Sequence, residues 1–123
     1  QELNYGINYR AIRYADVLLM AAEANSRKAS PNDSKAQNYL NQVRARAFGN
    51  NSRASSSTGA TLTKEIWNER RLELAMEGHR FFDLVRTGEA AATIPGFIAG
   101  KHEVFPIPQT EIDISGLTQN AGY

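Results

Sequence analysis

The segment from residue 9 to about residue 29 constrains the fold more than any other part of the sequence. Its apolar side chains recur at the spacing of a helix, which predicts one amphipathic helix here. The middle of the segment, residues 17–22, is apolar on nearly every side and includes two alanines. A helix of this kind is stable when neighbours pack on more than one of its faces. The chain must therefore build other helices around it.

A second helix is predicted over residues 34–48. The Ser-Pro-Asn-Asp turn at residues 30–33 ends the first helix and offers N-cap side chains, and Gly49 supplies a stop. Two helices joined by so short a turn form an antiparallel hairpin. The Ser-rich loop over residues 49–61 has no large apolar side chain to offset its ordering entropy, so we expect it to be mobile.

A third helix is predicted over residues 63–86, with a weak point at Gly78. Leu62 and Trp67 have the spacing of a hydrophobic staple at its start. After the third helix, the prolines of residues 88–123 hold the backbone extended and predict a long irregular tail. The fold class that follows is all-α. We expect the tail to dock on the helices through four apolar side chains, which are Phe105, Ile107, Ile112 and Leu117.

Charged side chains fall inside the apolar face of the third helix. Arg70, Glu73 and Glu77 share that face with Ile66 and Leu74. A charge that is buried without a partner is costly, so these side chains must pair with one another or line a wet cleft. Helical spacing predicts an ion-pair network that fixes the packing. Its expected members are Glu69, Arg70, Glu73, Glu77, Arg80 and Asp83, and the expected pairs are Glu73 with Arg70, Glu77 with Arg80, and Arg80 with Asp83.

The same carboxylates raise an enzymatic alternative. Glu73 and Glu77 are one helical turn apart, which suits the acid and base that cleave a glycosidic bond. Such pairs are frequent on helices, and carboxylates held by arginine stay ionised at neutral pH, which denies a general acid. His79 and His102 stand in no metal-binding or catalytic motif, and the chain has no cysteine. We therefore predict no catalytic residue, no metal site and no cofactor.

Composition argues against two further classes of protein. With 14 Lys and Arg against 13 Asp and Glu among 123 residues, the net charge is +1, a poor basis for binding nucleic acid. No apolar stretch is long enough to span a bilayer. The first residues contain neither an initiator Met nor a signal peptide, so we expect a fragment or a processed chain.

Four blocks of sequence, taken in order, carry a resemblance to a known family. Residues 13–24 read Arg-Tyr-Ala-Asp-Val-Leu-Leu-Met-Ala-Ala-Glu-Ala, and residues 40–47 read Leu-Asn-Gln-Val-Arg-Ala-Arg-Ala. Residues 69–86 read Glu-Arg-Arg-Leu-Glu-Leu-Ala-Met-Glu-Gly-His-Arg-Phe-Phe-Asp-Leu-Val-Arg. The tail reads Phe-Pro-Ile-Pro-Gln-Thr-Glu-Ile-Asp at residues 105–113 and ends in Leu-Thr-Gln-Asn-Ala-Gly-Tyr. Together these blocks resemble the SusD/RagB family.

The resemblance implies an all-helical body with TPR-like helix pairs. It also implies a surface-exposed, outer-membrane lipoprotein of Bacteroidetes that binds glycans, or sometimes peptides, and covers a SusC-type TonB-dependent transporter. This chain would be the C-terminal part of such a protein. Its partners would include the remaining N-terminal part, where the lipid-bearing cysteine would lie. We therefore expect non-catalytic binding of an oligosaccharide and its delivery to the SusC-like transporter.

Two questions stay open from the sequence. The alternative function is a TPR-like scaffold for protein–protein interaction, or a peptide-binding member of the same family. A large apolar groove would favour the scaffold, and a shallow aromatic platform would favour glycan binding. The ligand-binding residues stay unassigned, although several aromatic side chains suit stacking on a sugar. These are Tyr5, Tyr9, Tyr14, Trp67, Phe97 and Phe105, and packing roles are favoured for Trp67 and Phe105.

Overall fold

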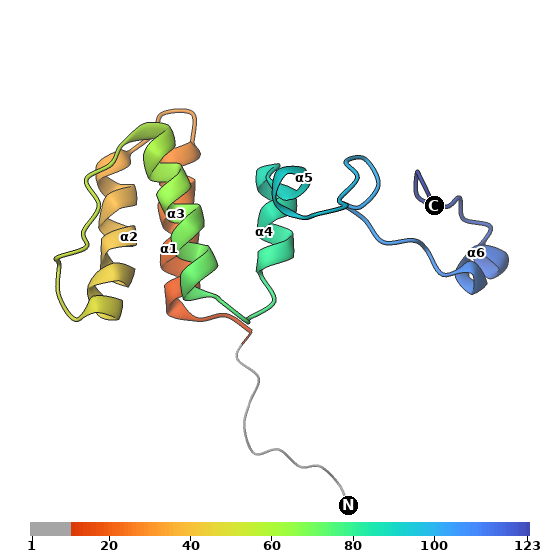
Figure 1. Cartoon of the computed structure of the whole chain (residues 1–123), viewed down its shortest axis with the longest axis horizontal. Coiled ribbons are helices and arrows are strands. Elements are labelled where there is room, and N and C mark those ends of the chain that lie inside the picture. The colour runs from red at the N-terminus through yellow and green to blue at the C-terminus, as the bar shows by residue number, and fades with distance from the viewer. Residues whose placement is uncertain (1–10) are drawn as a thin grey trace, which may run out of the picture. The chain divides into compact units, whose positions relative to one another are not determined.

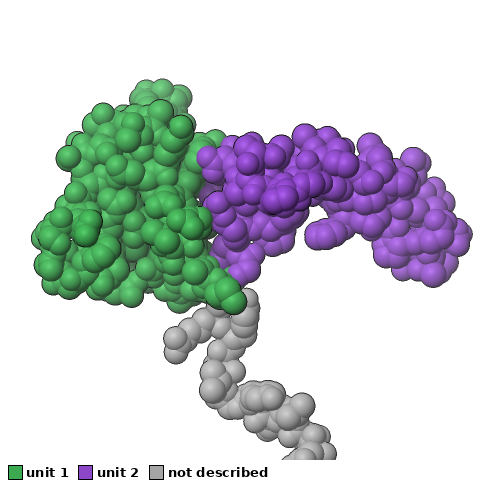
Figure 2. Space-filling model, viewed as in Figure 1, with its two compact units in different colours: residues 1–77 green, residues 78–123 purple. Residues whose placement is uncertain are grey.

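The computed structural model of the chain describes residues 11–123, and these residues form helices and connecting segments without a strand (Figure 1). The all-α fold class is thereby confirmed. Two compact units divide the chain, Gln1–Glu77 and Gly78–Tyr123, coloured separately in Figure 2. The division falls beside Gly78, where the sequence predicts a weak point. Each unit is described by itself below.

Unit 1 is a bundle of three helices that lie side by side (Figure 1). They are α1 (Tyr14–Arg27), α2 (Asp33–Phe48) and α3 (Gly59–Glu73). Helix α1 is the central element, because it packs extensively against both of the others. The largest side chains that the bundle buries completely are Leu19, Leu40, Leu62, Ile66 and Val43. All three helices therefore contribute to one core.

Helix α1 begins later than the sequence predicts. Residues 9 and 10 lie outside the described residues, and residues 11–13 are not helical. Arg13 precedes the first helical residue with an extended backbone, at φ −109° and ψ 154°. Its side chain is thus free to reach away from α1 toward another element.

The connection between α2 and α3, which composition predicts to be a mobile loop, makes several polar contacts with α2. Asn41 of α2 binds Ser55 twice: its Nδ2 donates to the carbonyl oxygen (3.0 Å), and its Oδ1 accepts from the amide (2.7 Å). Nε2 of Gln37 donates to the carbonyl oxygen of Ser57 (2.7 Å), and the amide of Gly59 donates to Asp33 (2.8 Å). Polar contacts with α2 therefore supply this segment with partners that its composition did not predict.

Helix α3 differs from the prediction at its start. It begins at Gly59 rather than at residue 63, with Thr58 as the N-cap residue. Leu62 consequently lies inside the helix and is buried in the core. The staple predicted from Leu62 and Trp67 is wrong, because Leu62 does not precede the helix.

Helix α3 also ends earlier than predicted, at Glu73. The expected helix over residues 63–86 is interrupted because the backbone turns through the left-handed region twice, at Met76 (φ 67°) and Gly78 (φ 82°). Helices cannot continue through such residues. Met76 is the one residue other than glycine with a positive φ among residues 11–123. The weak point is therefore a complete break, and a new helix starts at Arg80.

Unit 2 contains three short helices, α4 (Arg80–Thr87), α5 (Ala90–Thr93) and α6 (Gln109–Ser115). The predicted irregular tail over residues 88–123 thus includes two helical segments. Pro108 precedes the first turn of α6, and Gly116 ends it with φ 63°. The last residues are tied to the preceding segment, since Gln119 exchanges two hydrogen bonds with the backbone of Ile107 (2.8 and 2.9 Å).

The tail buries less apolar surface than expected. Phe105 is 73% exposed and Leu117 is 50% exposed, whereas Ile107 and Ile112 are half-buried. Phe105 has a ring contact with Phe81, at 6.3 Å between ring centroids. Full burial of these anchors is not observed, because the buried hydrophobic side chains of unit 2 are only Leu84 and Ala90 among the described residues.

Candidate functional site

Arg13 joins the start of α1 to the end of α3. Its guanidinium donates to both carboxylate oxygens of Glu77 (2.6 to 3.1 Å) and to Oε1 of Glu73 (3.0 Å). Nη2 also donates to the main-chain oxygen of Glu73 (2.8 Å), the last residue of α3. A cation there meets the negative end of the helix dipole. The hydrogen bonds to Glu77 and then Glu73 raise the pKa of Arg13 above its ordinary value.

Glu73 connects all three helices of unit 1. Besides Arg13, its carboxylate accepts a hydrogen bond from Nη2 of Arg46, near the end of α2. The Glu73 side chain is only 9% exposed, whereas the Arg46 side chain is 63% exposed. One carboxylate therefore holds cations from two other elements at the same end of the bundle.

A second ion pair is buried between α1 and α3. Nη1 of Arg70 donates to Oδ1 of Asp16 at 2.6 Å, and the two side chains are 6% and 8% exposed. Charges at this depth persist because each neutralises the other. Asp16 lies in the first turn of α1, where a negative charge also meets the positive end of that helix.

A third group of charges links α2 to α3. Nε of Arg44 donates to Glu69 (2.8 Å), and Nη1 of Arg44 donates to Glu65 (3.2 Å). The hydroxyl of Ser57, in the loop before α3, donates to the other oxygen of Glu65. This hydroxyl is the largest cause of a lowered pKa for the Glu65 carboxyl, and Arg44 lowers it further, whereas burial opposes both.

The structure divides the six side chains that the sequence predicts as a network. Glu69, Arg70, Glu73 and Glu77 lie in unit 1, and Arg80 and Asp83 lie in α4 of unit 2. The partners also differ from those predicted by helical spacing. Glu73 binds Arg13 and Arg46, Glu77 binds Arg13, Arg70 binds Asp16, and Asp83 binds Arg86 at 2.7 Å.

Helical spacing missed four members of the network, which are Arg13, Asp16, Arg44 and Arg46. Arg13 immediately precedes α1 and the other three lie in α1 and α2, so no i,i+4 argument within the third helix could find them. All four lie in the first two sequence blocks that resemble the family, and those blocks were the sequence feature that could have pointed to them. Three of these four are arginines, the residue that best binds carboxylates through several hydrogen bonds.

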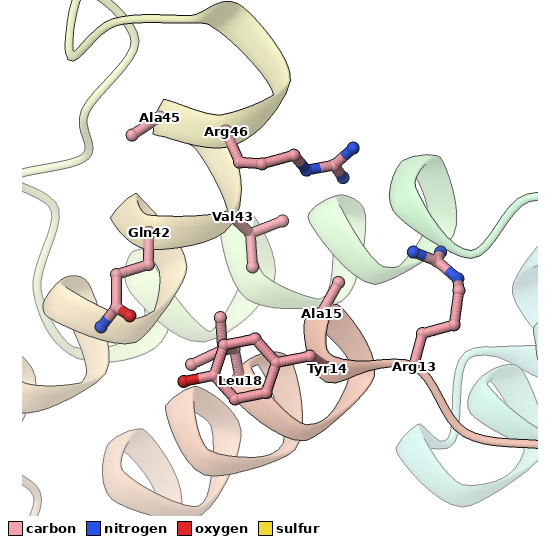
Figure 3. Close-up of a pocket in the computed structure, with 8 residues that line it drawn as sticks. All are labelled: Arg13, Tyr14, Ala15, Leu18, Gln42, Val43, Ala45 and Arg46. Atoms are coloured by element: carbon pink, nitrogen blue, oxygen red, sulfur yellow. The ribbon is translucent and has the colours of Figure 1, made fainter.

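A groove of about 590 Å³ lies between α1 and α2 (Figure 3). Its apolar lining comes from Ala15, Leu18, Val43 and Ala45. The ring of Tyr14 lies beside Leu18, and Gln42 adds an amide (Figure 3). Arg13 and Arg46, which bind Glu73, border the groove at the end of the bundle. The groove thus offers an apolar floor with one exposed aromatic ring.

The other aromatic side chains suited to sugar stacking have different surroundings. Tyr5 and Tyr9 lie outside the described residues. Trp67 is half-buried, and Arg27 lies over its ring at 5.4 Å. Phe97 and Phe105 line a hollow of about 340 Å³ in unit 2, together with Phe81, His102 and Tyr123. Of the described aromatic candidates in unit 1, Tyr14 is the exposed one, at 72%.

The acidic groups of unit 1 are arranged for packing. Glu73 and Glu77 share the Arg13 guanidinium, which joins the start of α1 to the end of α3. Within residues 11–123, no cluster of three or more acidic or histidine side chains could hold a metal ion. No helix in the same range is both long and apolar enough to cross a membrane.

The sequence matches the model of the SusD family over residues 1–103. The chain belongs to the SusD family. SusD-like protein P2 of Formosa agariphila is 32% identical over 94% of this chain, and SusD-like protein P25 of the same organism is 32% identical over 91%. SusD-like protein P38 is 35% identical over 68% of the chain. The chain spans 26% of P2, 23% of P25 and 18% of P38, so it covers only about a quarter or a fifth of these SusD-family relatives.

Membership in the SusD family confirms the resemblance drawn from the four sequence blocks. The members of the network in unit 1 come from the first three blocks, except for the Ser57 and Glu65 contacts that extend it. The antiparallel hairpin of α1 and α2, followed by α3, agrees with the TPR-like helix pairs that the SusD family implies.

Proposed function

We propose that the chain is the C-terminal part of a non-catalytic protein that binds oligosaccharides at the bacterial cell surface and delivers them to a SusC-type TonB-dependent transporter. The observation that carries this proposal is membership in the SusD family over most of the chain. A lipid anchor on a cysteine outside this chain would hold the protein at the outer membrane. Unit 1 would contribute a rigid helical body to the whole protein.

The pairing of the acidic groups supports a role without catalysis. A general acid must hold a proton near neutral pH. Glu73 and Glu77 both accept hydrogen bonds from the Arg13 guanidinium, at 3.0 and 2.6 Å. These carboxylates hold helix ends together, which supports a packing role for them.

The groove between α1 and α2 supports a second candidate, a TPR-like scaffold or a peptide-binding member of the family. Its lining is mainly aliphatic, with Leu18 and Val43 as the larger side chains. A floor of this kind suits the apolar side chains of a peptide or helix. It contains one aromatic ring, that of Tyr14, so the broad aromatic platform expected for glycan binding is not formed by this groove.

The test uses the full-length protein and a panel of soluble oligosaccharides. Isothermal titration should show saturable binding of at least one glycan, and chromatography of the mixtures should show no shortened product. The protein should also copurify with a TonB-dependent transporter from detergent-extracted outer membranes. Binding of peptides with no binding of glycans would favour the second candidate. Turnover of a glycan that Glu73→Gln abolishes would overturn the non-catalytic proposal.

A further inference from the structure

One histidine closes the turn at residues 98–102 of unit 2 from both sides. The amides of Lys101 and His102 donate to the main-chain oxygen of Ile98, at 3.2 and 3.0 Å. In the opposite direction, the amide of Ile98 donates to Nδ1 of the His102 ring at 3.0 Å. His102 therefore binds both the amide and the carbonyl oxygen of Ile98. We call residues 98–102 the His102 turn.

The hydrogen bond from Ile98 fixes where the imidazole carries its proton. A ring nitrogen that accepts an amide proton has none of its own, so the neutral ring of His102 holds its proton on Nε2. Protonation of Nδ1 turns this acceptor into a second donor, and its N–H would then face the N–H of Ile98. The hydrogen bond is therefore compatible with the neutral ring only.

The His102 ring also belongs to the aromatic hollow of about 340 Å³ in unit 2. The ring is half-buried, and it contacts the ring of Phe97 at 5.7 Å between centroids, with the two planes nearly perpendicular at 81°. Phe97 directly precedes the His102 turn, whereas Val104 and Phe105 follow it, and all three line the hollow. The closed turn therefore holds together the residues on its two sides that shape the hollow.

The charged and titratable side chains around the ring make contacts elsewhere. On the segments that line the hollow, these side chains are Lys101, Glu103, Tyr123 and, in α4, Arg80, Asp83 and Arg86. Glu103 accepts a hydrogen bond from the amide of Gly100 at 3.1 Å. The ammonium of Lys101 lies over the ring of Tyr123 at 4.7 Å. No carboxylate of residues 11–123 forms an ion pair with the imidazole, so none stabilises its protonated form by direct pairing.

We propose that His102 is a pH-sensitive switch that sets the shape of the aromatic hollow in unit 2. With a neutral ring, His102 closes the turn. With a protonated ring, the amide of Ile98 loses its acceptor and the turn opens. Histidine is the side chain whose charge changes between about pH 5 and 8, so mild acidification is sufficient. This inference goes beyond the proposed function, and its tests use no glycan, so each can fail without the other.

Nitrogen NMR of the full-length protein with isotope-labelled histidine tests the protonation state. At about pH 7.5, the spectrum should show an unprotonated Nδ1 and a protonated Nε2 for His102. The signals that disappear in His102→Asn identify this ring. A proton on Nδ1 of the neutral ring would overturn the proposal, because that nitrogen could not accept from Ile98.

Hydrogen exchange of the Ile98 amide in the full-length protein measures the switch itself. Between about pH 7.5 and about pH 5.5, the protection of this amide, corrected for the intrinsic exchange rate, should fall about tenfold. His102→Asn places an oxygen close to the position of Nδ1 without a titratable group, so protection should persist at both pH values. His102→Gln places its oxygen one bond farther out and should leave the amide weakly protected at both. Protection that does not change with pH in the wild type would overturn the proposal, and would assign closure of the turn to the ring contact with Phe97.

The other histidine of the chain, His79, provides the matched control. His79 precedes α4, its side chain does not cap that helix, and it does not line the hollow. His79→Asn should therefore keep the pH dependence of Ile98 exchange that the wild type shows. Loss of the pH dependence in His79→Asn, with its retention in His102→Asn, would assign the switch to the wrong histidine and overturn the proposal.

A fluorine probe at Phe105 shows whether the hollow follows the turn. Phe105 lines the hollow and is 73% exposed, so Phe105→p-fluorophenylalanine is a mild change. The fluorine NMR signal should shift over the same pH range in which Ile98 exchange changes. In the double variant with His102→Asn, the signal should stay constant over that range. A constant signal in the presence of His102 would show that the turn opens without altering the hollow, which contradicts the proposal.

Discussion

The two units of the chain use side chains in opposite ways. Unit 1 buries one continuous core from α1, α2 and α3, and it places buried ion pairs beside that core. Unit 2 buries only Leu84 and Ala90 among its described hydrophobic residues, and it leaves Phe82, Phe105 and Ile114 at least 65% exposed. Unit 1 therefore has the buried core of a domain, whereas unit 2 leaves most of its apolar side chains exposed.

The comparison of the two units shows that charged side chains find specific partners where an apolar core fixes their positions. In unit 1 the ion pairs lie between helices that an apolar core already holds together, so each guanidinium finds its carboxylate in a fixed position. In unit 2 most side-chain hydrogen bonds are with the backbone, such as that from the Tyr123 hydroxyl to the main-chain oxygen of Val104 at 2.9 Å. Contacts of this kind order a segment without supplying a core.

The largest loss of stability is expected when a substitution breaks the buried ion pair of unit 1. Arg70→Ala should lower the free energy of unfolding by about 3 to 5 kcal/mol, because it leaves the Asp16 carboxylate buried without its guanidinium. Urea unfolding followed by circular dichroism measures the loss. Arg71→Ala is the control, since Arg71 is exposed and its side chain binds the neighbouring Asn68, and it should change the value by less than about 0.5 kcal/mol. A loss no larger than the control would mean that the pair is not buried.

A second pair of variants compares the apolar side chains of the two units. Leu40→Ala should cost about 2 to 5 kcal/mol, because Leu40 is fully buried and its removal leaves a cavity. Leu117→Ala should cost under about 1 kcal/mol, because Leu117 is already 50% exposed. Thermal unfolding of each variant tests the difference. Equal losses would show that the tail is packed as tightly as the bundle.

A smaller effect is expected at the loop before α3. Asn41→Ala removes both hydrogen bonds to Ser55 and should cost about 1 to 3 kcal/mol. Hydrogen exchange of the Ser55 amide should become faster, because its acceptor is lost. Asn38→Ala, on the exposed side of α2, should leave that exchange rate unchanged. Unchanged exchange in Asn41→Ala would instead support the mobile loop that composition predicts.

The smallest effect concerns the pKa of Glu65. Ser57→Ala should raise this pKa toward its ordinary value, because the hydroxyl is the largest cause of the lowering. A lowered pKa in the folded state stabilises the protein above the pKa of the unfolded state, and this stabilisation is lost as the pH falls. Ser57→Ala should therefore lose less stability than the wild type on acidification. A titration of the Glu65 carboxyl by NMR, with Ser56→Ala as control, checks the direction.

Sequence patterns predicted a helix well where a capping residue marks its start and a glycine marks its end. The second helix was expected over residues 34–48 and is observed as Asp33–Phe48, because Asn32 caps its start and Gly49 stops it. The end of α3 could not be found in this way. Apart from Gly78, residues 69–86 read as helix-compatible and contain no proline, whereas the backbone also turns left-handed at Met76 (φ 67°), which no residue-type signal marks.

The ion pairs show the same limit for the site. Helical spacing sees partners three or four positions apart, but Arg44 pairs with Glu69 across 25 positions and Arg70 pairs with Asp16 across 54. The presence of charges in an apolar stripe correctly indicated that partners were required. Which partners meet is decided by the packing of α1 and α2 against α3, and a single helical wheel does not contain that information.

The contact between Arg13 and Glu77 has a consequence for the order of folding. These residues are 64 positions apart, so their contact closes a loop that contains the whole of unit 1. Each hairpin can form before this closure, whereas the contact itself needs all three helices in place. The pair thus connects the two ends of the folded bundle. Fraying at the start of α1 breaks this contact and also frees the end of α3, so the two helix ends should unfold together. Residues 74–79 should then become accessible to proteases.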